Sequence, residues 1–75
     1  MPSWAQVSGA DIIRVLTHLG FVEVRQRGSH VVLKKSGDLG TRGCVVPMHK
    51  RMALGTIMGI LKQAGVTKKE FDEHL

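Results

Sequence analysis

Side chains that could act on an anionic polymer gather in one short stretch near the middle of the chain, residues 24–35. Four basic side chains, the hydroxyl of Ser29 and the imidazole of His30 fall within these twelve residues. Histidine is the one side chain whose ordinary pKa lets it accept and release a proton near neutral pH. We therefore take His30 as a candidate acid–base group that lies where a polyanion binds.

This set of residues suits the cleavage of RNA without a metal ion. The 2′-hydroxyl of RNA is an internal nucleophile beside the scissile phosphate, so the substrate itself supplies proximity. The protein must add a base for that hydroxyl, for which His30 is the candidate, and cations that stabilise the developing charge. His49, in a second basic segment, is the candidate acid. The residues expected to contact RNA are Arg25, Arg27, Ser29, Lys34, Lys35, Lys50 and Arg51.

Other chemistries find less support in the sequence. The acidic residues do not cluster with His30 or His49, and no His-x3-His pair is present, so we expect neither a metal site nor a cofactor. The glycines match neither a phosphate-binding Walker loop nor a dinucleotide fingerprint. Backbone N–H groups at Gly55 and Thr56 could hold a phosphate, although ordinary helix capping explains these two residues more simply.

Positive charge is concentrated in the middle of the chain. The formal charge is +5, and seven basic residues face a single acidic one, Asp38, between Val24 and Arg51. Such a concentration indicates a nucleic acid or another polyanion as partner, and the alternative is a solvated face that only keeps the protein soluble. With Trp4, Phe21 and Phe71 as the aromatic residues, recognition by extensive base stacking is disfavoured.

Length and hydropathy set the class of protein. A chain of 75 residues, 43% of them hydrophobic, predicts one domain over residues 1–75 with one small core. The single cysteine, Cys44, lies in an apolar run and reads as a buried thiol. No stretch approaches about 18 apolar residues, so we expect neither a signal peptide nor a membrane span, and a cytoplasmic protein.

The elements that position these residues can be read from capping and periodicity. Ser8 and Asp11 form a predicted capping box, which starts a helix that ends at Gly20. A second helix is predicted from about residue 54 to Gly65, and Thr67 with Glu70 starts a short final helical turn.

Between the helices the alternation of apolar and polar residues predicts strands. Residues 21–26 place Val22 and Val24 on one face, a tight turn follows at Arg27-Gly28, and the next strand turns Val31 and Leu33 toward the core. His30 and Lys34 then share the exposed face, and a slip of one residue would bury the histidine. Residues 36–43 read as a mobile loop, and 44–46 as a short third strand closed by Pro47.

The predicted fold class is therefore α+β, with a three-stranded antiparallel sheet and two helices packed on one face. Five blocks of sequence sharpen this prediction: Leu19-Gly20-Phe21, Arg27-Gly28-Ser29-His30, Val46-Pro47-Met48-His49, Leu54-Gly55-Thr56-Ile57 and Ile60-Leu61-Lys62-Gln63-Ala64-Gly65. In this order the blocks resemble the HicA toxin family, the small messenger-RNA interferases of bacterial and archaeal toxin–antitoxin pairs.

The resemblance implies a double-stranded-RNA-binding-domain-like α-β-β-β-α fold. It implies that His30 is the catalytic residue of a metal-independent endoribonuclease, and that a HicB-type antitoxin covers it and usually binds operator DNA. His49 matches a recurrent position of the family whose catalytic role is less settled. Met48 stands where the family commonly has a polar or basic residue, so the substrate surface is expected to differ there.

Two functions are compatible with these residues. The first is a toxin ribonuclease, and the second is a non-catalytic RNA-binding module of the same fold, which grips A-form RNA by its shape and phosphates. His30 favours the first, because phosphate binding alone does not require a histidine beside the turn. A third alternative is an interaction domain whose basic face binds an acidic protein, and competition by RNA would separate it from the others.

Overall fold

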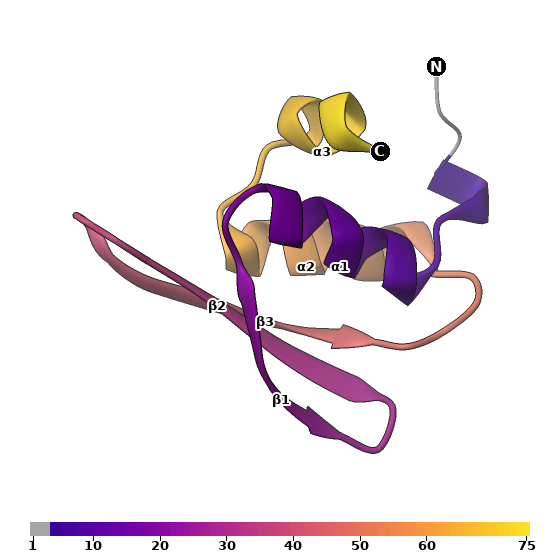
Figure 1. Ribbon diagram of the computed structural model, residues 1–75. Helices are drawn as coiled ribbons and strands as arrows, with labels where there is room; N and C mark the ends of the chain where they lie inside the picture. Colours follow the sequence, from indigo (N-terminus) through magenta and orange to yellow (C-terminus); the bar gives the residue numbers. More distant parts are fainter. Residues whose placement is uncertain (1–3) are drawn as a thin grey trace.

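The computed structural model describes residues 4–75 and has two helices on one face of a sheet (Figure 1). The sheet has three antiparallel strands in the order β1-β2-β3. Helix α3 lies on the side of α1 and α2 that faces away from the sheet. The predicted α+β architecture is thereby confirmed. The elements are η1 (Trp4–Gln6), α1 (Gly9–His18), β1 (Val22–Arg27), β2 (His30–Gly37), β3 (Gly40–Pro47), α2 (Leu54–Ala64) and α3 (Lys68–His74).

Helix α1 begins at the predicted capping box. The hydroxyl of Ser8 accepts a hydrogen bond from the Asp11 backbone N–H at 3.0 Å, and the Asp11 carboxylate accepts one from the Ser8 backbone N–H at 3.0 Å. The bond from the Ser8 backbone lowers the pKa of the Asp11 carboxyl. These bonds satisfy N–H groups that would otherwise lack partners at the helix start.

Replacing Asp11 by asparagine should lower the free energy of unfolding by about 0.3–1 kcal/mol at neutral pH, because a negative charge near a helix N-terminus is lost. The folded-state pKa of Asp11 is lowered, so its contribution is present above the ordinary aspartate pKa and disappears as pH falls through the lowered value. Urea unfolding of both proteins at pH 7 and at pH 3 measures this. An equal difference at both pH values would contradict the assignment.

The prediction of which residues face the core is confirmed for β2 and has to be corrected for β1. Val31 and Leu33 are buried, while Lys34 is exposed on the opposite face. In β1 a bulge shifts the register between Glu23 and Arg25. All of β1 is exposed, with Val22 at 63% and Val24 at 52%, so neither of the two valines predicted to share a face contributes to the core. As an edge strand, β1 has a neighbour on one side only.

The prediction of a loop over residues 36–43 is also wrong. Strands β2 and β3 continue through this segment, with Lys35 opposite Arg42, Ser36 opposite Thr41 and Gly37 opposite Gly40. A two-residue turn, Asp38-Leu39, closes a hairpin that projects beyond the helices (Figure 1). Backbone pairing holds this extension together with little burial, since residues 34–43 are all exposed.

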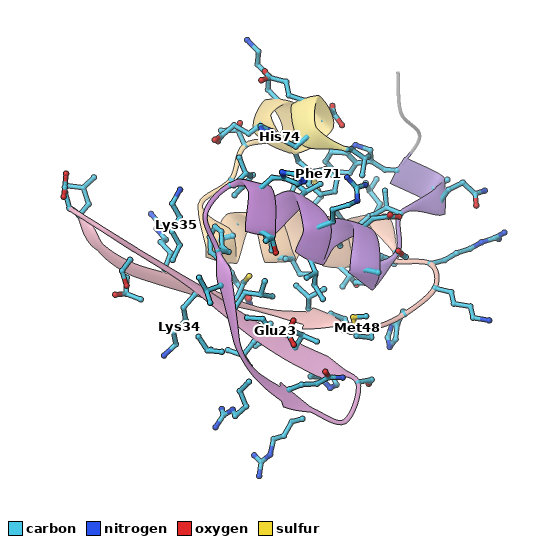
Figure 2. All side chains as sticks on the ribbon, in the orientation of Figure 1. Glu23, Lys34, Lys35, Met48, Phe71 and His74 are labelled. Carbon is cyan, nitrogen blue, oxygen red and sulfur yellow. The ribbon has the colours of Figure 1, made fainter. Side chains whose placement is uncertain are left out.

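The core lies between the sheet and the helices. Helix α2 ends at the predicted Gly65, whose φ of 70° is the left-handed value that glycine adopts readily. Helix α3 begins at the predicted box of Thr67 and Glu70 and turns Phe71 inward, fully buried (Figure 2). The buried residues are Val7, Ile12, Val15, Leu16, Phe21, Val31, Leu33, Cys44, Val46, Met52, Ile57, Ile60, Leu61, Ala64 and Phe71.

Cys44 is 3% exposed, and burial raises the pKa of its thiol to about 11. We expect Ellman's reagent to modify the native protein at pH 8 roughly 100-fold more slowly than the unfolded protein, because the raised pKa leaves a far smaller fraction of the thiol ionised in the folded state. The unfolded thiol ionises at lower pH, so Cys44 lowers stability as pH rises from about 8.5 toward 11. A rapid native reaction would show that the strand opens locally.

Candidate active site

His30 is positioned by the tight turn between β1 and β2. Arg27 and His30 pair across the two strands, and Gly28-Ser29 forms the turn, one residue later than predicted. Gly28 has a φ of 57°, a conformation that glycine adopts without strain. The Gln26 side chain donates a hydrogen bond to the Gly28 carbonyl at 3.1 Å and braces the turn.

The open face of the sheet carries His30 together with three cations. The pairing places Arg27, His30 and Pro47 in one cross-strand row. The next rows on this face are Arg25-Val32-Val45 and Val22-Lys34-Gly43. His30 is exposed, and its ring makes no hydrogen bond within residues 4–75. This open face therefore combines an accessible imidazole with guanidinium and ammonium groups, around a centre formed by valines.

Two backbone hydrogen bonds connect the turn beside His30 to the segment that carries His49. The Met48 N–H donates to the Ser29 carbonyl at 2.6 Å, and the Gly9 N–H donates to the His49 carbonyl at 2.9 Å. These bonds join the β1–β2 turn, residues 48–49 and the first residue of α1. The two predicted histidines therefore belong to neighbouring segments at one end of the sheet.

Gly9 was not identified from the sequence as part of this arrangement. A Cβ atom at this position would lie 2.2 Å from the Pro47 carbonyl oxygen and 3.0 Å from the Met48 Cα. Only glycine lets the start of α1 approach the end of β3 so closely. A glycine at the first position of a helix, where alanine has the better helix propensity, is the signal that could have revealed the contact.

Lys34 and Lys35 lie on opposite faces of the sheet (Figure 2). Lys34 shares the open face with His30, whereas the Lys35 ammonium lies on the helix side, 6.0 Å from the centre of the Phe21 ring. Lys50 and Arg51 are exposed in the connection to α2. The structure thus separates Lys35 from the other residues expected to contact RNA.

The surface has two hollows, which are lined by different parts of the chain. The larger, about 470 Å³, lies beneath the β2–β3 hairpin, and its lining includes Lys35, Arg42 and Gly65. A smaller one of about 300 Å³ lies between the start of α1 and the segment after β3, and it is lined by Ser8, Ala10, Met48, His49 and Lys50. Since the smaller hollow includes His49 and begins next to the bond between Met48 and Ser29, it is the one that belongs to the candidate site.

Residues 4–75 contain no group of three or more His, Cys, Asp or Glu side chains that could hold a metal ion. None of the helices that they form is long and apolar enough to cross a membrane. The chain is thus a small basic α+β domain with an accessible histidine on an open sheet face.

Comparison with known families places this domain. A family model described as "HicA toxin of bacterial toxin-antitoxin" matches residues 9–66, which is most of the 75-residue chain. The chain therefore belongs to the HicA toxin family, whose members are the toxins of toxin–antitoxin pairs. No curated protein matches the sequence.

Proposed function

We propose that this toxin is a cytoplasmic, metal-independent endoribonuclease that cleaves messenger RNA and is neutralised by a HicB-type antitoxin. The observation that carries the proposal is the open face of the sheet, where the exposed His30 stands in one row with Arg27 and shares the face with Arg25 and Lys34 in the next two rows. Membership of the HicA family supports a toxin with an antitoxin partner. The chemistry is inferred from the residues.

In the proposed reaction His30 accepts the proton of the 2′-hydroxyl. The 2′-oxygen then attacks the adjacent phosphorus, and the charge that develops on the phosphoryl oxygens is stabilised by Arg27, the cross-strand neighbour of His30. The bond from phosphorus to the 5′-oxygen breaks, and His49 gives that oxygen a proton. The products are a 2′,3′-cyclic phosphate and a free 5′-hydroxyl, and the reaction takes up no water.

The remaining cations bind the RNA on either side of the cleaved phosphate. Arg25 and Lys34 occupy the next two rows of the open face and suit neighbouring phosphates. The Ser29 hydroxyl lies in the turn beside His30, and Lys50 and Arg51 extend the basic surface along the connection to α2. Lys35 would contact only RNA that continues around the sheet to its helix side.

One observation favours the alternative, a non-catalytic RNA-binding module. Catalytic histidines are commonly oriented by a hydrogen bond to their second ring nitrogen, and the His30 ring makes no such bond within residues 4–75. A substrate group would have to orient the ring instead. Under this alternative the cations of the open face bind phosphates and no bond is broken.

The ends of the RNA products test the proposal. Purified toxin in EDTA should cut an RNA oligonucleotide to give fragments with 2′,3′-cyclic phosphate and 5′-hydroxyl ends, which mass spectrometry identifies. A matched oligonucleotide with one 2′-deoxyribose at the cut site should bind equally and resist cleavage there. Cleavage that depends on a divalent ion, or that persists at the deoxyribose, would overturn the mechanism, and binding without cleavage of naked or ribosome-bound RNA would favour the RNA-binding module.

A further inference from the structure

We infer that the hollow of about 300 Å³ between the start of α1 and residues 48–50 binds one nucleobase of the RNA, the base on the 3′ side of the cleaved phosphate. That the bound polymer is RNA rests on the proposed function. The hollow adds Met48 and Ala10 as residues that determine which nucleotide is accepted. Neither residue has a role in the proposed bond-breaking steps.

The composition of the hollow fits a base better than a phosphate. Met48 is 41% exposed, and together with the exposed Ala10 it gives the hollow an apolar surface. Figure 2 shows Met48 at the end of β3, below the first turn of α1. A thioether makes favourable contacts with aromatic rings, and a nucleobase presents such a ring, whereas a phosphate gains nothing from an apolar lining.

The polar groups of the hollow suit the edge of a base. His49 and Lys50 also line it, and both carry N–H groups that can donate to the ring nitrogen or carbonyl acceptors of a base. The N-terminus of α1 is not available to a phosphate here, because Ser8 and the Asp11 carboxylate already cap it. The Asp11 carboxylate would also repel a second negative charge at this end of the helix.

The position of the hollow indicates which nucleotide of the RNA would place its base there. The Met48 backbone N–H donates a hydrogen bond to the carbonyl of Ser29, the residue before His30, so the segment that lines the hollow is held against the turn that carries His30. His49 is the proposed acid for the leaving 5′-oxygen, and it lines the same hollow. The base attached to that leaving ribose therefore lies closest to Met48, which places the nucleotide on the 3′ side of the cut in the hollow.

A coupling experiment tests this inference without requiring cleavage. The probe is a 2′-O-methyl RNA hexamer of mixed sequence, which cannot be cut, with one abasic ribose moved through each position in turn. Fluorescence anisotropy measures its affinity for the wild type and for two variants, Met48→Ala and Ala10→Leu. The first removes the apolar contact, and the second fills the hollow from an exposed helix position. Leu39→Ala, at the far hairpin tip and fully exposed, is the matched control.

The expected result is a loss of affinity of about two- to tenfold for the wild type at one abasic position. That loss should vanish in Met48→Ala and in Ala10→Leu and remain in Leu39→Ala. An equal abasic effect in all four proteins, or no position-specific effect, overturns the inference even if the toxin cleaves RNA. Coupling without any cleavage of natural RNA would keep the base site and overturn the ribonuclease mechanism.

Discussion

Replacing His30 by alanine should reduce RNA cleavage by about 10²–10⁴-fold, the usual contribution of a positioned general base. RNA binding should change little, because the cations of the open face, Arg25, Arg27 and Lys34, remain. His30 is exposed and its ring makes no hydrogen bond within residues 4–75, so the variant should also keep the stability of the wild type. Cleavage rates at saturating protein, together with thermal unfolding, check both expectations.

His18 provides the matched control, since it is an exposed histidine at the end of α1 and lies outside the open face. His18→Ala should cleave RNA at the wild-type rate. If His30→Ala is as active as His18→Ala, then His30 is not the base and the chemistry belongs elsewhere or to a contaminant. If neither the wild type nor the variants cleave RNA but all bind it, the RNA-binding module becomes the better account.

Replacing Gly9 by alanine should lower the free energy of unfolding by about 1–3 kcal/mol, the usual cost of forcing an extra group into a well-packed site. The new Cβ would lie 2.2 Å from the Pro47 carbonyl oxygen, and backbone atoms cannot move aside as a flexible side chain can. In a domain of this size each 1 kcal/mol corresponds to about 4–8 °C in Tm. Thermal unfolding of the purified variant measures the loss.

Gly59→Ala is the control for that experiment and should change stability in the opposite direction. Gly59 is exposed inside α2, and a Cβ added there meets no atom within 4 Å. Alanine at such a position should raise the free energy of unfolding by about 0.5–1 kcal/mol, because glycine is a poor helix former. If both variants were stabilised, the contact between α1 and the end of β3 would not be as close as the structure shows.

Capping and periodicity predicted the helices well, because both are local properties of the chain. Ser8 with Asp11, and Thr67 with Glu70, are boxes that close within four residues, and Gly65 ends α2 as expected. The strands were harder to predict, since their lengths depend on partners elsewhere in the chain. Residues 36–43 contain three glycines and read as a loop, yet backbone pairing alone is enough to continue the hairpin through them.

The faces of the sheet were predictable only where the period of two is unbroken. In β2 it placed Val31 and Leu33 in the core and Lys34 outside, and the structure confirms this. In β1 the bulge after Glu23 breaks the period, and no composition signal marks it. The hollow beside Met48 was also invisible in sequence, because residues 8 and 10 meet residues 48–50 only through the packing of α1 against the end of β3.

The bonds from Met48 to Ser29 and from Gly9 to His49 have a consequence for control. They tie the β1–β2 turn and the start of α1 to the segment that follows β3, a strand whose residue Val46 is buried in the core. A change in the shape of this end of the sheet would have to break one or both of these bonds. Under the proposed function, an antitoxin would inhibit the toxin by covering the open face, and its removal would expose a surface that is already formed.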